Sequence, residues 1–534
     1  MNQSFFEILQ SQISVLLENQ VIVVFLIYFS IFLILIAMLY IIRSFFHLES
    51  KIKSSFNKII YLVKIPKEKK GEKPDQTNND GDNINKIREE IAIAETLFSA
   101  IAGIKRQKGF FKWLTGKDNH ISFELVTTNR KISFFVAVPK NLSSFTTQQI
   151  HAQYPHAEID EVPDYNIFKP QSHIVGAYLW FKYKSVFPLK TYKKLDSDPL
   201  LSLLNPLSKI NDDEGIAIQY VLRPASPKWR RQGVHVVRDI KKGEKFEYTA
   251  RRSWFTRGLY KWKNLIFDKS NDPTKQHDTG EKYQLTQMEE EMVKSMEEKL
   301  SRGGLELAIR IISSADSKDK AQLNLENILN SFSQYNIYRY GNSLAAAIPR
   351  RPNKIISDFI HRAMAHTQYM VVNTEEMASL WHLPLPTTEI PNINWLGARK
   401  APPPTNMPTD GIMLGKAVYR GSNVVVRMKR ADRRRHLYTI GKSGSGKSVL
   451  IQNMAIQDVQ NGEGICVVDP HGDFVEYVLQ HIPKERADDV IYFNPSDIDR
   501  PLGLNMLEAK TEEQKDFISQ EMVAIFYKLF TDPS

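Results

Sequence analysis

Residues 441–448 read Gly-Lys-Ser-Gly-Ser-Gly-Lys-Ser and decide the fold of the C-terminal part of the chain. They fit the pattern G-x-x-x-x-G-K-[S/T], in which backbone N–H groups surround phosphate oxygens while the lysine and the hydroxyl complete the site. A strand expected at 436–440 precedes the loop, and a helical pattern at 447–460 follows it. Strand, glycine loop and helix therefore occur in the order that a nucleotide-phosphate site needs.

Each position of the loop has an expected role. Glycines at 444 and 446 let the backbone turn its N–H groups inward, the lysine at 447 is the expected catalytic cation on the β and γ phosphates, and the serine at 448 is the expected Mg²⁺ ligand. The expected ligand is then a nucleotide phosphate with Mg²⁺, and the resemblance described below implies that the nucleotide is ATP. The expected nucleotide-binding residues are Gly441, Lys442, Ser443, Gly444, Ser445, Gly446, Lys447 and Ser448.

A second acidic segment follows one helix and one strand later. The apolar run 464–468 predicts a buried parallel strand, and Asp469 ends it. A carboxylate at that edge of a sheet points toward the ligand crevice, so Asp469 is a candidate for catalysis and for orienting Mg²⁺. The alternative is that Asp469 and Asp473 cap the turn and the next helix, and His471 is interpreted as a turn residue. A third strand is expected at 490–494.

At these residues the sequence resembles the HerA/FtsK superfamily of DNA-pumping ATPases. The resemblance rests on residues 435–448 and on the segment Asp-Pro-His-Gly-Asp at 469–473, and it covers about 411–534. Within the superfamily the chain looks most like the TraG/TraD-type coupling proteins of type IV secretion and conjugation. The resemblance implies a RecA-like α/β fold, a homo-oligomeric ring, ATP hydrolysis coupled to DNA movement, an inner-membrane anchor and contacts with secretion-system components. By the same likeness Arg435 is expected to contact the nucleotide.

Three features depart from that family. No later apolar strand ends in Asp-Glu, the second acidic motif, and the chain stops at 530–534 without a stop signal for the fold. Coupling proteins also commonly have two membrane helices, and the sequence offers one. These departures predict a truncated, partial ATPase domain that binds nucleotide and hydrolyses it poorly. Whether the chain is an enzyme stays open, with a membrane-tethered scaffold or nucleotide-sensing protein as the alternative function.

The N-terminal region contains an uncharged apolar run at 21–42. As a helix it spans about 33 Å, enough for the hydrocarbon core of a bilayer. The charged residues before it are Glu7 and Glu18, whereas Arg43 and several lysines follow it closely, which favours an N-terminus outside and an ATPase domain in the cytoplasm. The expected location is thus the inner membrane, crossed once. A cleaved signal peptide is the alternative interpretation.

Composition divides the chain into six segments. They are a short extracytoplasmic N-terminus at 1–20, the membrane helix at 21–42, a basic juxtamembrane segment with a disordered linker at 43–85, an α+β region at 86–384, a proline-rich linker at 385–410 and the ATPase part at 411–534. Proline lacks an N–H and fixes φ, which is why 385–410 is expected to be irregular.

The α+β region shows alternating strand and helix patterns. One arrangement that fits them is two ferredoxin-like units. Helices are expected from 87 and at 146–154, 199–210, 228–240, 284–300 and 320–332, and strands at 121–126, 131–138, 157–162, 174–182, 216–222, 305–312 and 343–348. In the ATPase part, further strands are expected at 411–419 and 423–428.

Charge and cysteine usage bound the partners and the compartment. The formal net charge is +11, which favours an anionic partner such as nucleic acid or a lipid surface. The stretch 251–263 interleaves cations with aromatic rings and suits nucleic acid, a membrane interface or plain packing. A second basic cluster at 427–434 is interpreted as a ring interface or a solvated face. Cys466 is the only cysteine and is expected to be buried in a reducing compartment.

Overall fold

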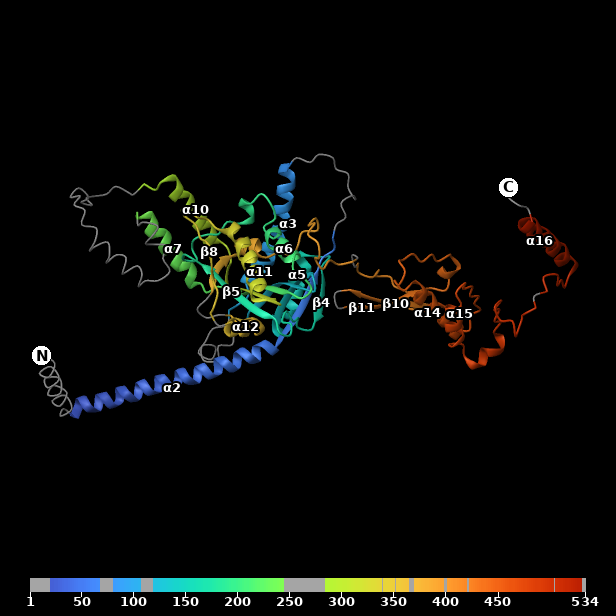
Figure 1. Ribbon diagram of the computed structural model, residues 1–534, viewed down its shortest axis with the longest axis horizontal. Coiled ribbons are helices and arrows are strands. Elements are labelled where there is room, and N and C mark those ends of the chain that lie inside the picture. Colours follow the sequence, from blue (N-terminus) through green and yellow to red (C-terminus); the bar gives the residue numbers. More distant parts are fainter. Residues whose placement is uncertain are drawn as a thin grey trace. The chain divides into compact units, whose positions relative to one another are not determined.

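The computed structural model describes residues 20–67, 80–106, 119–243, 284–338, 340–350, 352–364, 369–397, 401–419, 422–503 and 505–530 (Figure 1). The chain divides into two compact units, Met1–Lys400 and Ala401–Ser534. The basic and aromatic stretch at 251–263 lies outside the described residues.

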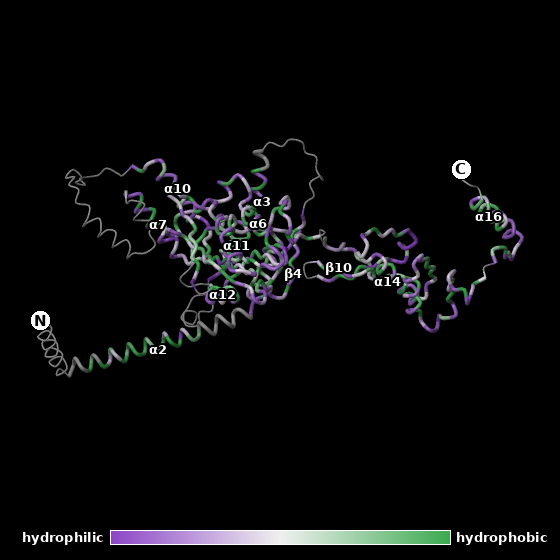
Figure 2. The backbone as a smooth tube through the Cα atoms, viewed as in Figure 1, coloured by the Kyte–Doolittle hydropathy of each residue, from purple (hydrophilic) through white to green (hydrophobic). Residues whose placement is uncertain are grey.

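The N-terminal unit begins with a long helix, α2 (Gln20–Phe56). Its stretch Ile27–Phe46 is apolar along its whole length, and none of it is buried against the rest of the protein. Figure 2 colours this stretch as hydrophobic. A helix of this length and composition can cross a bilayer, although a signal sequence has the same features. The predicted apolar helix is therefore present as one candidate membrane span, and helical structure continues well beyond residue 42.

A nine-stranded antiparallel sheet forms the centre of this unit. Its strands lie in the order β4-β1-β3-β2-β6-β7-β5-β8, and β9 pairs with the first residues of β7. The strands are β1 (Lys58–Lys64), β2 (Ile121–Thr128), β3 (Lys131–Pro139), β4 (Glu158–Val162), β5 (His173–Phe181), β6 (Gly215–Pro224), β7 (Gly304–Ala315), β8 (Leu344–Ala347) and β9 (Met370–Asn373).

The two halves of this sheet repeat one topology. β1 to β4 follow the chain pattern β-α-β-β-α-β and lie in the order fourth, first, third, second; β5 to β8 do the same when the sheet is followed from its other end. The halves meet where β2 pairs with β6. The helices that complete the two patterns are α3 (Asp80–Ala102), α5 (Ser143–Gln153), α6 (Leu201–Ser208) and α11 (Lys318–Ser331).

These four helices and α13 (Thr374–Leu380) bury one face of the sheet in the main hydrophobic core. Strand side chains alternate between the two faces, so residues such as Phe123 point into this core while their neighbours point away. Trp381 lies at its centre and is 1% exposed. Its ring centroid is 4.6 Å from that of Phe123 and 6.1 Å from those of Phe98 and Phe134.

The opposite face carries a polar ladder beside a smaller apolar cluster. Glu124, Gln219, Arg310 and Tyr178 are register partners on neighbouring strands. Gln219 Nε2 donates to Glu124 Oε1 at 3.0 Å, and Arg310 Nη1 donates to Gln219 Oε1 at 2.5 Å. Helix α12 (Asn353–Ile360) packs over this face, with Ile355 and Phe359 in the apolar cluster.

Arg362, just after α12, neutralises the buried end of this ladder. Its Nε donates to Glu124 Oε1 at 2.7 Å and its Nη2 donates to Glu124 Oε2 at 3.1 Å. Burial raises the pKa of the Glu124 carboxyl, but the Arg362 guanidinium outweighs burial, so the net pKa is below the usual 4.5. The carboxylate is therefore charged although it is 0% exposed.

Two segments expected to be linkers are partly built into this unit. Residues 58–64 form β1, which pairs with both β3 and β4, because Tyr61 and Val63 join the main core. Leu385 and Ile393 of the proline-rich run are also buried in that core. Proline prevented these residues from forming a helix or a ladder, but it did not prevent packing. Short 3-10 helices complete the unit at η1 (Lys140–Leu142), η2 (Tyr192–Lys194) and η3 (Phe332–Tyr335).

Helices α7 (Lys228–Lys241) and α10 (Gln287–Ser301) form an insertion between β6 and β7 and pack against each other (Figure 1). Their shared core is a separate apolar cluster.

Most predicted elements of the α+β region are confirmed to within a few residues. The sequence patterns missed β1, β9, α12 and α13, which are short or lie in stretches interpreted as linker.

Candidate nucleotide site

The C-terminal unit begins with β10 (Ile412–Tyr419) and β11 (Ser422–Met428), at the positions of the two predicted strands, and they pair antiparallel. The helices that follow are α14 (Lys447–Gln460), α15 (Asp473–Leu479) and α16 (Glu512–Phe530), with 3-10 turns η4 (Asp432–Arg434) and η5 (Lys484–Asp489). Gln457 of α14 grips the first residues of β10. Its side chain accepts from Met413 N at 2.8 Å and donates to Met413 O at 2.9 Å.

The loop 441–448 has the backbone that its glycines require. Gly444 has φ +77° and Gly446 has φ +91°, in the left-handed region that strongly favours glycine. Gly441 is needed for a different reason, because a Cβ there would collide with the Ser445 hydroxyl. Gly446 is also the N-cap of α14, so the loop delivers the chain directly into a helix N-terminus. Free N–H groups and the helix dipole at that end favour a bound phosphate.

Lys447 lies folded over its own loop. Its Nζ donates to the carbonyl of Gly441 at 2.7 Å and to that of Lys442 at 3.0 Å. These two carbonyls hold the ammonium group over the loop in which phosphate oxygens are expected. Ser448 follows at the second position of α14, where its hydroxyl is on the same first turn as the loop amides. The residues present therefore fit a nucleotide phosphate and an accompanying Mg²⁺, which Ser448 would ligate.

Asp469 occupies a turn and not the end of a formed strand. Its Oδ2 accepts from Phe474 N at 2.9 Å, and its Oδ1 accepts from His471 N at 3.2 Å. The hydrogen bond from Phe474, followed by that from His471, lowers the pKa of the Asp469 carboxyl. The geometry is that of the capping alternative, since these bonds order the turn before α15. Among the described residues no hydrogen bond joins Asp469 to Lys447 or Ser448, so its catalytic and metal roles stay predictions.

Arg435 follows η4 at an exposed position just before the loop. The basic cluster next to it is partly neutralised, because Arg433 forms a two-pronged ion pair with Asp458 of α14 and Arg430 pairs with Glu463 at 2.8 Å. The pair with Asp458 raises the pKa of the Arg433 guanidinium. These contacts fix the chain leading into the loop against the helix leaving it.

The strands expected at 436–440, 464–468 and 490–494 are not formed among the described residues of this unit. A parallel strand needs a hydrogen-bonded neighbour and a cover on each face, and these segments have neither. Their apolar side chains are open to solvent, with Ile440 80%, Val468 88% and Ile491 84% exposed. Cys466 is exposed as well, so its predicted burial is wrong in this structure for the same reason.

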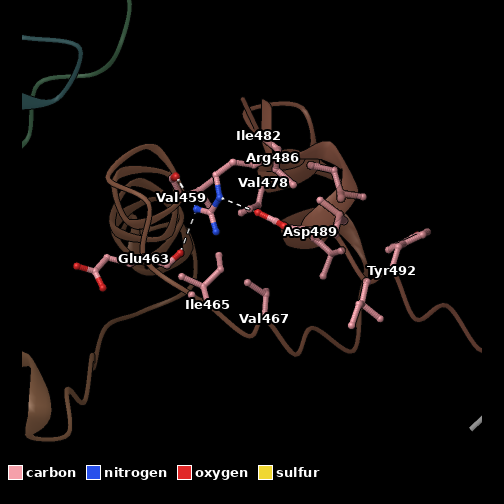
Figure 3. Close-up of a pocket in the computed structure, with 14 residues that line it drawn as sticks. Val459, Glu463, Ile465, Val467, Val478, Ile482, Arg486, Asp489 and Tyr492 are labelled. Carbon is pink, nitrogen blue, oxygen red and sulfur yellow. Dashed lines mark hydrogen bonds and ion pairs between the residues drawn. The ribbon is translucent and has the colours of Figure 1, made fainter. Parts of the chain in front are cut away.

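Two of these segments border an open hollow of about 210 Å³ (Figure 3). Arg486 crosses it: Nη1 donates to the carbonyls of Val459 at 2.8 Å and Glu463 at 3.1 Å, and Nε lies 3.5 Å from Asp489. Arg486 thereby satisfies carbonyl groups at the C-terminus of α14, the end opposite the glycine loop. The sequence analysis did not predict this cap, because nothing in the short polar segment around Arg486 indicates that its side chain caps α14. No residue of the loop 441–448 lines the hollow.

Comparison with known families separates the two units. The N-terminal region matches the family described as a domain of unknown function, DUF8128, over residues 83–396, more than half of the 534-residue chain. The chain belongs to this family. The matched range takes in the sheet from β2 onward, the α7–α10 insertion and the buried part of the proline-rich run.

The C-terminal region matches the central domain of helicase HerA over residues 412–525. This match begins at β10 and includes the glycine loop and Asp469. It supports the HerA/FtsK-type P-loop ATPase superfamily and a P-loop NTPase fold for this region. Comparison with curated proteins finds no match.

Proposed function

We propose that the protein is a membrane-anchored, ATP-binding DNA translocase of the HerA/FtsK type. The observation that carries the proposal is the loop 441–448, in which two glycines are left-handed, Lys447 lies over the loop and α14 starts at once. The match to the helicase HerA central domain supports DNA as the partner and a homo-oligomeric ring as the assembly. The finer assignment, a TraG/TraD-type coupling protein working with secretion-system components, rests on the sequence resemblance alone.

The membrane location is supported by α2. Its exposed apolar stretch Ile27–Phe46 has the length of a bilayer core. Basic residues after it, such as Arg43, and acidic residues before it favour a single-pass topology with the ATPase unit in the cytoplasm and the inner membrane as the location.

We also propose that each half of the sheet is a ferredoxin-like unit, because each half has the β-α-β-β-α-β pattern and the same strand order.

A second candidate is a membrane-tethered scaffold that binds nucleotide without turning it over efficiently. The hydrogen bonding of Asp469 favours this candidate, because both carboxylate oxygens already accept from backbone N–H groups. A carboxylate held this way orders the turn and is less free to orient Mg²⁺ or a water molecule.

The test compares nucleotide binding and ATP turnover in the full chain, in Lys447→Ala and in the control Lys484→Ala, which changes an exposed lysine outside the loop. Loss of a charge-assisted contact worth up to about 3 kcal/mol should weaken nucleotide binding about 100-fold in Lys447→Ala. The control should bind like the unmodified chain. Equal binding by all three proteins would overturn the nucleotide site.

Turnover separates the two candidates. ATP hydrolysis that requires Lys447 and is stimulated by duplex DNA supports the translocase. Binding without hydrolysis supports the scaffold. DNA affinity should fall steeply as salt is raised, since phosphate contacts release counterions, and an affinity independent of salt would contradict DNA binding through the backbone.

A further inference from the structure

Helix α7 carries a line of basic side chains on one side. Positions 228, 231, 235, 238 and 242 are three or four residues apart, so their side chains follow one another along the helix. All five are exposed, and within the described part of the chain none of their side chains takes part in a hydrogen bond or ion pair. These residues, Lys228, Arg231, His235, Arg238 and Lys242, are called the α7 stripe.

The stripe lies directly opposite the face that α7 buries. Gly233, Val236, Val237 and Ile240 are the buried residues, and at 3.6 residues per turn they project to the other side of the helix. This buried face packs on α10. The cations outside the stripe are already engaged: Lys241 pairs with Glu297 of α10 at 2.6 Å, and Arg230 donates to the Arg302 carbonyl at 2.8 Å. Neither contact involves a side chain of the stripe.

α7 is held firmly on the sheet domain. The Trp229 ring lies where a Cβ on Gly304 would have to be, so the first turn of α7 packs directly on the start of β7. α10 is anchored through a buried ion pair between Lys299 Nζ and Glu376, at 2.9 Å, with each side chain 1% exposed. The domain thus presents the stripe in a fixed direction.

The sheet register places the start of α7 at the same end of the strands as the end of α2. Only Asn57 separates α2 from β1, and Lys58 at the start of β1 contacts His120, just before β2, at 2.7 Å. Ile121 of β2 pairs with Leu222, at the end of β6, and β6 leads into α7. β1 and β6 are three strand spacings apart, or about 15 Å. Exposed Lys140 lies at the same end of the strands, and its backbone N–H donates to the Asn57 carbonyl at 3.2 Å.

From this placement we infer that the α7 stripe docks on the anionic lipid headgroups of the membrane that α2 crosses. The inference rests on the proposed membrane anchorage. The end of β6 that leads into α7 lies about 15 Å from β1, and residues 47–56 of α2 add about 15 Å between its apolar stretch and β1. α7 is itself about 21 Å long, so the chain holds the stripe near the headgroups at a high effective concentration. Each basic side chain near an anionic surface strengthens binding about five-fold. A nucleic acid would also suit the positive charge of the stripe. The membrane is favoured because α2, its proposed anchor, joins the sheet at this same end of the strands.

The experiment uses the full chain in nanodiscs of phosphatidylcholine, with and without phosphatidylserine. A fluorophore on Val234→Cys, in a Cys466→Ser background, reports on α7 through quenching by a nitroxide on lipid headgroups; Val234 is 47% exposed beside the stripe. Quenching is expected in the anionic discs and should disappear at high salt, where charges are screened beyond about 3 Å. Arg231→Glu with Arg238→Glu should shift the docking equilibrium by at least about 25-fold.

The matched control reverses the charge of two exposed lysines at the opposite end of the strands, Lys131→Glu with Lys318→Glu. It should leave quenching unchanged. Flotation with the discs measures insertion of α2 separately. Failure to float overturns the membrane anchor and this inference with it. Flotation with equal quenching in both lipid mixtures overturns the inference alone. Protection of α7 by duplex DNA, but not by phosphatidylserine, would overturn it in favour of a nucleic-acid surface.

Discussion

The two units of this protein differ in where their apolar residues lie. In the unit Met1–Lys400 a nine-stranded sheet is covered by helices, and Trp381 is 1% exposed among three phenylalanines. In the unit Ala401–Ser534 the apolar cluster is small, with Ala455, Val459 and Val478 as its buried members. Apolar segments beside the glycine loop stay open to solvent.

The difference teaches that stability and chemistry reside in different units. Burial of apolar surface is the main favourable term in folding, and it is concentrated in the sheet domain. The phosphate loop needs only backbone geometry over a few residues, and a glycine pattern can specify that locally. A chain can therefore carry a well-formed loop on a unit that buries little.

The largest expected effect is on the sheet domain. Arg362→Ala removes the guanidinium that pairs with the buried Glu124 carboxylate and leaves that charge without its main partner. We expect the free energy of unfolding to fall by about 3–5 kcal/mol. Arg130→Ala, which breaks an exposed pair with Asp212, should cost about 0–1 kcal/mol. Denaturant unfolding of the full chain in detergent would measure both.

Measuring the nucleotide affinity of Arg362→Ala tests whether the two units are independent. If the units are separate in stability and chemistry, nucleotide binding should persist in Arg362→Ala under conditions where the sheet domain is still folded. A loss of nucleotide binding that parallels the loss of stability would break the comparison.

The next effect is a dependence of stability on pH. The folded-state pKa of Glu124 is below its unfolded value of 4.5, so the unfolded chain binds the proton more readily. The stabilising contribution is therefore complete above about pH 4.5 and is lost as the pH falls through the folded-state pKa. Unfolding curves of the unmodified chain and of Glu124→Gln should converge as the medium becomes acidic. Parallel curves would show that Glu124 does not titrate as described.

A smaller effect is expected in the glycine loop. Gly446→Ala places a Cβ on a residue with φ +91°, which costs about 1–2 kcal/mol in backbone conformation. Nucleotide affinity should fall about ten-fold, with unfolding of the sheet domain unchanged. Gly503→Ala is the control, because Gly503 has room for a Cβ and a φ outside the left-handed region. Unchanged affinity in Gly446→Ala would mean that the loop backbone is not needed for binding.

The smallest change concerns one thiol. Cys466 is exposed in the segment 464–468, so maleimide should label it in the native protein nearly as fast as in the unfolded protein. Protection by more than about ten-fold would show that this segment is covered in solution, as a buried strand would be. That outcome would remove the main difference between the two units.

Sequence patterns predicted the sheet domain well wherever strand and helix periodicities were long. β2, β3, β6 and β7 were located to within a few residues, because their apolar alternation reflects burial directly. β1 was missed because it lies between a membrane-like helix and a polar run. Leu385 and Ile393 lie in the run expected to be an irregular linker, and their burial in the core depends on residues far away in the chain.

By itself the sequence determined the loop 441–448, its left-handed glycines and the helix after it, because these depend on interactions within a few residues. It also determined the apolar helix, since length and composition suffice for that. Only the tertiary structure decided the repeated strand order, the Arg362–Glu124 pair and the position of the start of α7 at the same end of the strands as the end of α2. Those features join residues distant in the chain, 238 positions apart for the Arg362–Glu124 pair, and strand pairing across long separations is set by the packing of the whole sheet.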